Sequence, residues 1–179
     1  GAWHTIFLTD DGQCYGCGDT QYGQIGVVQQ HQPSSTAVQN EFNNTTTSSA
    51  QQLNSVKSKY NIPEYIDQLS GYKIKSIACG YFHSVFIDTC GRIFTCGWAA
   101  YGQTGLGSSV TERLPMQVVQ LKTIPIHSAA CGWNHVICID KKGVCFGFGE
   151  AKHGQLGRDF TKPMQANQLQ QHHQQQQQR

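Results

Sequence analysis

Short apolar runs separated by turn residues form the main pattern of this chain. Residues 83–88 (H-S-V-F-I-D) contain the apolar run V-F-I, and residues 88–91 (D-T-C-G) are turn residues, with a glycine where a positive φ is easiest. Residues 92–96 (R-I-F-T-C) then return as a second apolar run. This pattern predicts a β-hairpin. The Y-G-Q-x-G motif that follows has two glycines, which favour a tight loop over a continuing strand.

The hairpin pattern occurs three times in the same register. No insertion or deletion occurs within the unit, and equivalent positions are separated by 79 and 52 residues. Such positions are His4, His83 and His135, then Gly12, Gly91 and Gly143, and finally Gly23, Gly102 and Gly154. A fixed period of about 50 residues is typical of a solenoid, a propeller or an array.

The repeat extends upstream of the hairpin. Pro63 and Pro115 each lie 16 residues before a cysteine that opens the hairpin unit, Cys79 and Cys131 respectively. Apolar positions between them also match at an offset of 52 residues, so the full repeat has apolar segments for about four short strands. Radial repetition of four-stranded units builds a β-propeller. The sequence therefore predicts an all-β fold.

The motif C-G-x-x-H, followed by the turn glycine and by Y-G-Q-x-G, resembles the repeats of the regulator of chromosome condensation (RCC-type) family. The resemblance covers about residues 1–26, 63–107 and 115–157. The Trp-Asp signature of WD repeats and the Gly-Gly pair expected of kelch repeats do not occur in the chain.

The resemblance implies an architecture larger than this chain. The family usually closes its propeller with about seven blades, within the range known for propellers. The 179 residues would then form a partial β-propeller of about three four-stranded antiparallel blades. Because the chain starts at Gly1, inside a repeat, we interpret it as a fragment or a partial array.

Composition divides the chain into repeat units and two low-complexity segments. A Gln-, Asn-, Ser- and Thr-rich insertion accounts for the longer of the two spacings, and a Gln-rich tail ends the chain. Both have few large apolar side chains, so we expect them to be disordered. The expected organisation is 1–26 for the end of the first repeat, 27–62 for the insertion, 63–114 for the second repeat, 115–164 for the third repeat and the start of the next, and 165–179 for the tail.

Charge and hydropathy narrow the classes of partner. The chain has 13 Lys and Arg against 11 Asp and Glu, and these basic residues are scattered rather than gathered into the stripe of a nucleic-acid-binding domain. No apolar run approaches the roughly 18 residues of a membrane helix, and no signal peptide is visible. We therefore expect a protein partner rather than a nucleic acid or a membrane.

Eight cysteines, including the pair Cys14-x-x-Cys17, raise the question of a metal or redox site. The repeat register places Cys14 at the position of Ile93 and Cys17 at the position of Phe148. Cysteine thus alternates with large apolar residues, which favours buried structural thiols. A zinc site would need a second C-x-x-C pair, and disulfides are the remaining alternative. We expect reduced thiols, no metal and no cofactor, in an intracellular protein of the cytoplasm or the nucleus.

The repeated histidines and glycines do not form a catalytic set. A residue in the same place in every repeat serves what all repeats share, so we assign His4, His83 and His135 to hydrogen bonding and packing. The repeated glycines are assigned to turns and close approaches. No nucleophile with a base, no paired carboxylates and no phosphate-binding loop stands out. The sequence therefore predicts that the chain is not an enzyme.

Function is expected where the repeats differ, in the loops between strands. The variable loop positions are 2–3, 81–82 and 133–134, and then 19–21, 98–100 and 150–152. These loops carry large aromatic side chains of the kind enriched in interface hot spots. The candidate binding residues are Trp3, Tyr81, Phe82, Trp98 and Trp133. Alternatively, some of them pack against neighbouring blades.

Three functions are consistent with this pattern. The first is a non-enzymatic protein-interaction scaffold built from the repeats. The second, implied by the resemblance alone, is a guanine-nucleotide exchange factor for a Ran-type small GTPase, which acts by pressing on the GTPase and needs no cofactor. The third is a targeting module of a larger protein such as a ubiquitin ligase. Fold does not determine function, and the sequence shows no feature specific to exchange.

Overall fold

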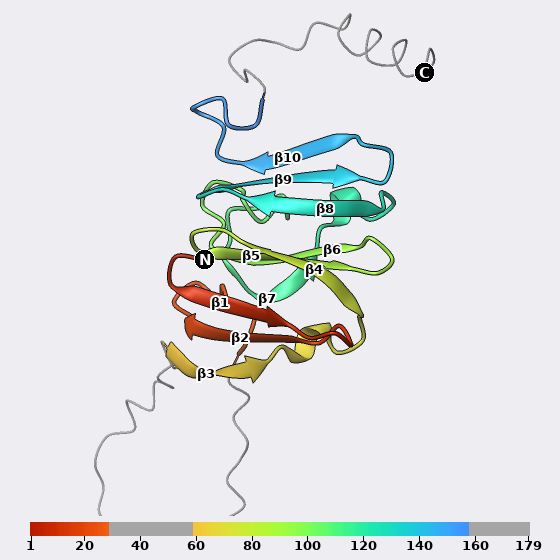
Figure 1. Ribbon diagram of the computed structural model, residues 1–179. Helices are drawn as coiled ribbons and strands as arrows, with labels where there is room; N and C mark the ends of the chain where they lie inside the picture. Colours follow the sequence, from red (N-terminus) through yellow and green to blue (C-terminus); the bar gives the residue numbers. More distant parts are fainter. Residues whose placement is uncertain (29–58, 158–179) are drawn as a thin grey trace, which may run out of the picture.

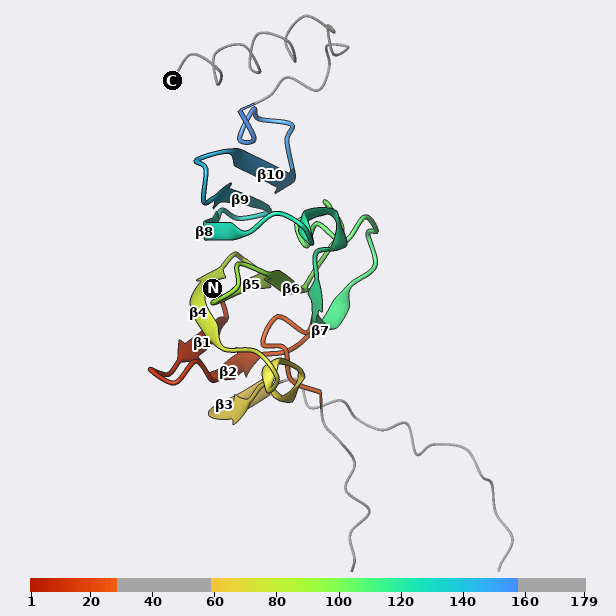
Figure 2. The ribbon, with the colours of Figure 1, turned by 90° about the vertical axis from the view of Figure 1, so that its right-hand side faces the viewer.

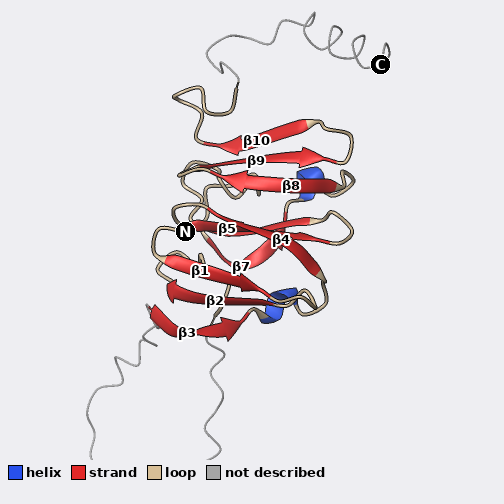
Figure 3. Ribbon diagram, viewed as in Figure 1, coloured by secondary structure: helices blue, strands red, loops and turns tan. Residues whose placement is uncertain are grey.

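The computed structural model describes residues 1–28 and 59–157, which form three antiparallel sheets stacked one on another (Figure 1). The predictions of disorder for the insertion and the Gln-rich tail fall on residues outside these ranges, apart from residues 27–28 and 59–62. The prediction is wrong for residues 59–62, which form part of a strand because they pair with the preceding hairpin. Within them, strands dominate and two three-residue 3-10 helices occur, η1 (Asp67–Leu69) and η2 (Val119–Leu121) (Figure 3). The all-β prediction is confirmed.

The sheets have three, four and three strands within the described ranges. Sheet 1 contains β1 (His4–Leu8), β2 (Cys14–Asp19) and β3 (Lys59–Tyr65). Sheet 2 contains β4 (Ile74–Cys79), β5 (His83–Asp88), β6 (Ile93–Gly97) and β7 (Glu112–Gln117). Sheet 3 contains β8 (Ile126–Cys131), β9 (His135–Asp140) and β10 (Cys145–Gly149). In each sheet the strand order follows the chain.

The three predicted hairpins are present and share one register. His83 pairs with Gly97 in β5–β6, and the equivalent histidines pair with Gly18 in β1–β2 and Gly149 in β9–β10. The turn glycine of the middle hairpin, Gly91, has a φ of +88°, which side-chain-bearing residues rarely adopt. Local turn chemistry thus sets the register of each hairpin.

The strand that opens each sequence repeat belongs to the sheet of the preceding repeat. β3, which contains Pro63, pairs with β2, and β7, which contains Pro115, pairs with β6. Both strands end their sheets, where proline is tolerated because its missing N–H need not bond to a further strand. Sequence repeat and sheet are therefore offset by one strand.

Two apolar layers hold the stack together. β5 is buried along its whole length because sheets lie on both of its sides. Its side chains alternate between the layers: Phe86 packs towards sheet 1, and Val85 and Ile87 pack towards sheet 3. On β9, by contrast, Val136 is buried against sheet 2, whereas Ile139 faces away and is 37% exposed.

One side of the stack brings neighbouring sheets closest together. There β4 lies beside both β1 and β8, while β7 lies on the opposite side (Figure 2). No helix in the described part of the chain is long and apolar enough to cross a membrane. This stacked arrangement aligns the three hairpins, so that equivalent loops of successive sheets are neighbours.

Candidate interaction site at the aromatic edge

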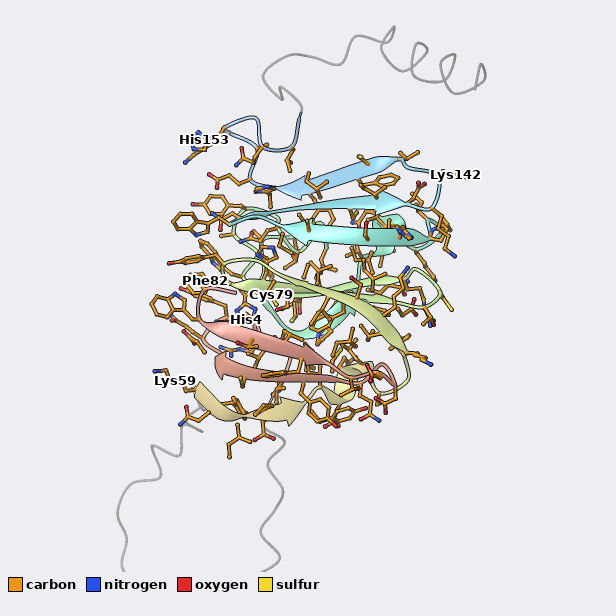
Figure 4. All side chains as sticks on the ribbon, in the orientation of Figure 1. His4, Lys59, Cys79, Phe82, Lys142 and His153 are labelled. Atoms are coloured by element: carbon orange, nitrogen blue, oxygen red, sulfur yellow. The ribbon has the colours of Figure 1, made fainter. Side chains whose placement is uncertain are left out.

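Equivalent loops gather at one edge of the stack. The loop before β5 and the loop after β6 are neighbours because His83 pairs with Gly97. Figure 4 shows Phe82 at this edge, where the other sheets also bring side chains together. We call this surface the aromatic edge and define it by its ring-bearing loop residues. They are Trp3, Tyr22, Tyr81, Phe82, Trp98, Tyr101 and Trp133.

Aromatic rings form a continuous series of contacts along this edge. Between sheets 1 and 2, the ring of Tyr22 lies 5.0 Å from that of Phe82 and 5.7 Å from that of Trp98, centroid to centroid. Between sheets 2 and 3, the rings of Tyr81 and Trp133 are 4.7 Å apart. Within sheet 2, Tyr81 contacts Phe82 at 4.4 Å, and Trp98 contacts both Phe82 and Tyr101. These are the distances of favourable offset and edge-to-face pairs.

Exposure divides these residues into two groups. Trp3, Trp133 and Tyr101 are 61%, 65% and 46% exposed, whereas the other four are half-buried. Tyr81, Phe82 and Trp98 pack across sheet boundaries, as the alternative interpretation allowed, and part of each ring is still exposed to solvent. Trp3 lies on the same edge, in the loop before β1.

Backbone hydrogen bonds hold these loops in place. The N–H of Trp98 donates to the carbonyl of Phe82 at 2.8 Å, and the N–H of Tyr81 donates to the carbonyl of Trp133 at 3.1 Å. The N–H of Ala2 donates to the carbonyl of Tyr81 at 3.4 Å. Each loop is thus tied either to its own hairpin or to the loop of the next sheet.

Sequence reasoning missed Tyr22 and Tyr101 as members of the aromatic edge. Both belong to the Y-G-Q-x-G motif, which predicted only a tight loop. The glutamine of that motif orients them: Gln24 Oε1 accepts the N–H of Tyr22 at 3.0 Å, and Gln103 Oε1 accepts the N–H of Tyr101 at 2.9 Å. The third copy repeats the bond between Gln155 and His153 at 2.8 Å. The recurrence of this glutamine in all three copies was the available signal.

Two of the three motif histidines, His4 and His83, lie beneath the aromatic edge and are buried between sheets. His4 is buried, and its Nε2 lies 2.8 Å from Ser84 Oγ across the first sheet boundary. The Ser84 hydroxyl donates its hydrogen to the carbonyl of Gln24 at 2.6 Å, so it accepts from His4 Nε2–H. Burial lowers the pKa of His4 to about 3 and that of His83 to about 4, so both are neutral at pH 7.

The glycine before each motif histidine is a close-approach position. The imidazole of His83 lies against Gly80, and a Cβ atom at residue 80 would overlap the ring. The glycine's N–H also donates to the carbonyl of His83 at 2.9 Å. Gly132 and His135 repeat this arrangement on sheet 3.

The cysteines only partly follow the prediction of buried thiols. All eight are free, and Cys14, Cys96 and Cys138 are buried in the two apolar layers. The prediction is wrong for Cys90 and Cys145, which are exposed. Cys90 lies in a hairpin turn, and Cys145 lies on a strand that is covered on one face only by the described sheets.

Two observations concern metal binding and cavities in the described residues. No group of three His, Cys, Asp or Glu side chains in these ranges is arranged to hold a metal ion. A cavity of about 510 Å³ opens beside η2 and β10, and its lining has no ionisable side chain. It includes Gly102, Gly105, Gln120, Leu121 and Phe148.

Comparison with known proteins identifies the family to which the repeats belong. The sequence profile described as Regulator of chromosome condensation (RCC1) repeat matches residues 11–87 and 90–139, and a second profile of the same description matches residues 74–103. The chain belongs to the RCC1-repeat family. The resemblance noted from the motifs is therefore confirmed.

Relatives of this RCC1-repeat chain include much longer proteins. It is 27% identical over 157 residues to the Ultraviolet-B receptor UVR8 of Arabidopsis thaliana, covering 88% of this chain and 30% of that protein. It is 30% identical over 182 residues to the Probable E3 ubiquitin-protein ligase HERC4 of Homo sapiens, covering 88% of this chain and 17% of that protein. The chain thus spans less than a third of the length of these two relatives.

Solved structures share the fold. Human WBSCR16 matches with a TM-score of 0.64 at 25% identity, over 85% of this chain and 33% of its own. Prp20p from Saccharomyces cerevisiae matches with a TM-score of 0.63 at 20% identity, over 88% of this chain and 33% of its own. With the three stacked antiparallel sheets, these similarities confirm the predicted partial β-propeller.

Proposed function

We propose that this RCC1-repeat chain is a non-enzymatic module that binds a protein partner through the aromatic edge. The observation that carries the proposal is the unbroken series of ring contacts that spans all three sheets and leaves Trp133 and Tyr101 exposed. Rings held by their neighbours lose little conformational freedom when a partner binds. Trp and Tyr are also the side chains enriched in interface hot spots.

The surroundings of the motif histidines support binding rather than catalysis. Ser84 and His4 are within hydrogen-bond distance, as in a nucleophile–base pair, but both are buried between sheets. A substrate would have no route to the hydroxyl, and the lowered pKa of His4 makes it a weak base. The free thiols favour a reducing compartment, the cytoplasm or the nucleus.

A small GTPase is the second candidate partner. The structure of Prp20p is described together with that protein's binding to Gsp1p and histones, and yeast RCC1 (Prp20) is also known bound to Kap60. These complexes support a protein partner for the present chain, and a Ran-type GTPase on which it would stimulate nucleotide exchange is the alternative tested below. The similarity to HERC4 favours a third role, as a targeting module within a ubiquitin ligase.

Quantitative affinity capture tests the aromatic edge. The immobilised chain is compared with Trp98→Ala, Trp133→Ala and a matched control, Ile62→Ala, which removes an exposed apolar side chain on β3. We expect the same proteins to be lost from both tryptophan variants and retained by the control. A hot-spot loss of about 2 kcal/mol corresponds to about a 30-fold weaker complex. Retention of every captured protein by both tryptophan variants would sink the proposal.

Nucleotide release separates the second candidate from simple binding. A Ran-type GTPase loaded with a fluorescent guanine nucleotide is mixed with the chain, and the release rate is followed. Acceleration that is lost in Trp98→Ala would support exchange through the aromatic edge. If release stays at the spontaneous rate while the GTPase is still captured, the chain binds the GTPase without catalysing exchange.

A further inference from the structure

A polar relay crosses the boundary between sheet 1 and sheet 2. His4 Nε2–H donates to Ser84 Oγ at 2.8 Å, and the Ser84 hydroxyl donates to the carbonyl of Gln24 at 2.6 Å. The thiol of Cys96 also lies 3.8 Å from that carbonyl. A strand of sheet 1, a tight loop of sheet 1 and two strands of sheet 2 are thereby linked by buried polar groups.

The boundary between sheet 2 and sheet 3 lacks this relay. The repeat offset of 52 residues places Val136 where Ser84 would be, and Phe148 where Cys96 would be. Neither side chain can donate or accept a hydrogen bond. His83, the equivalent of His4, is fully buried, and neither of its ring nitrogens has a partner in the described part of the chain. The second boundary thus has the histidine but not the hydroxyl that would bond to it.

Keeping one member of a relay is less favourable than losing the whole relay. Replacing both partners of a buried hydrogen bond by apolar groups can be nearly neutral, whereas leaving one partner unpaired carries its full desolvation cost. Val136 packs well in the second apolar layer, but it leaves the imidazole of His83 unpaired. For a single buried group this cost corresponds to a factor of about five or more in an equilibrium constant.

We propose that the boundary between sheets 2 and 3 is a joint, which opens more readily than the boundary between sheets 1 and 2. The contact between Tyr81 and Trp133 crosses this joint, whereas Tyr22 joins Phe82 and Trp98 across the other boundary. The joint therefore divides the aromatic edge into a fixed part on sheets 1 and 2 and a movable part carrying Trp133. This inference concerns the free protein, and it stands whether or not the aromatic edge binds a partner.

Two cysteines report opening of the two boundaries without added probes. Cys138 is buried in the apolar layer between sheets 2 and 3, and Cys96 is buried in the layer between sheets 1 and 2. The full chain is pulse-labelled with iodoacetamide at neutral pH in native conditions, and peptide mass spectrometry gives the labelling rate of each thiol. We expect Cys138 to be labelled at least fivefold faster than Cys96.

Reciprocal substitutions at equivalent positions test the cause. Val136→Thr keeps the shape of the side chain and adds the hydroxyl, so Cys138 labelling should slow about fivefold. Ser84→Val removes the hydroxyl that accepts from His4 Nε2–H between sheets 1 and 2, so this imidazole loses its partner. Cys96 labelling should then quicken by a similar factor. Thr5→Val is the matched control, because Thr5 occupies the same repeat position but is exposed on the face of sheet 1 away from sheet 2. It should leave both rates unchanged.

The labelling rates of these variants show which results would overturn the inference. If Val136→Thr leaves Cys138 labelling unchanged or quickens it, the unpaired histidine is not the cause and the inference is overturned. Equal labelling of Cys138 and Cys96 in the original chain would overturn it as well. Should Val136→Thr fail to fold, Ser84→Val decides alone, because unchanged labelling of Cys96 in that variant contradicts the role of the relay.

Discussion

The imidazole of His83 lies directly against Gly80, in the space that a side chain at residue 80 would need. The same pair of residues is joined by a hydrogen bond from the glycine N–H to the histidine carbonyl at 2.9 Å. Because the histidine is buried between sheets, it has no room to move away. The C-G-x-x-H motif is thus one packed unit, in which the glycine provides the space that the imidazole occupies.

Gly80→Ala should destabilise the protein severely. The added methyl overlaps a buried ring, and overpacking of this kind costs about 1–3 kcal/mol or more. Gly71→Ala is the matched control, since a Cβ atom there meets nothing within 4 Å. Urea unfolding followed by circular dichroism measures both variants. A loss for Gly80→Ala no larger than that for Gly71→Ala would contradict the close packing described here.

Gln103→Ala should loosen the tight loop that carries Tyr101. The variant removes the Oε1 acceptor of the Tyr101 N–H, in a fully buried position, at a cost of about 1 kcal/mol or more. Gln155→Ala removes the equivalent bond to the exposed His153, where water can replace the acceptor, so its effect should be smaller. Urea midpoints compare the two. Equal losses would show that burial of the glutamine is unimportant.

Acid should destabilise the protein through its buried histidines. Burial lowers the pKa of His83 to about 4 and that of His4 to about 3, from an ordinary value of 6.5. Below pH 6.5 the unfolded chain therefore binds protons that the folded chain does not, and the unfolding free energy falls as the pH falls towards 4. The expected slope is about 1.4 kcal/mol per pH unit for each histidine.

His83→Gln separates this effect from other acid effects, because glutamine does not titrate. Chemical unfolding at several pH values between 4.5 and 6.5 should give a shallower slope for this variant. His153→Gln makes the same substitution at an exposed position and is the control. An unaltered slope in His83→Gln would mean that His83 is not protonated on unfolding in this range.

Only some of the eight thiols should react with iodoacetamide in the folded protein. Cys90 and Cys145 are exposed and should be alkylated first. Burial raises the pKa of the Cys14 thiol to about 12 and that of Cys138 to about 11, so their reactive thiolate forms are scarce as well as shielded. Peptide mapping after a brief exposure to iodoacetamide checks the order. Early modification of Cys14 would contradict the burial described for it.

Much of the candidate site could be predicted because its residues lie at variable loop positions of a regular repeat. Tyr81, Phe82, Trp98 and Trp133 were expected in loops and are found in one series of ring contacts. Tyr22 and Tyr101 could not be predicted, because their rings meet partners on other strands and the Y-G-Q-x-G motif specifies only the turn of the backbone. Which loops become neighbours depends on how the sheets stack, and that is not a local property.

The hairpins, their register and the number of repeats in view could be predicted from local sequence, because turn glycines and alternating apolar residues act over a few neighbouring positions. The stacking of the sheets, in contrast, sets which sheet each repeat's first strand joins and which side chains meet between sheets. The pairing of His4 with Ser84, 80 residues apart, and the absence of a partner for the ring nitrogens of His83 in the described ranges are examples. Both depend on faces of separate sheets being brought together, and the energy that does so is hydrophobic burial, which has no direction and leaves no local signal of which polar groups it will join.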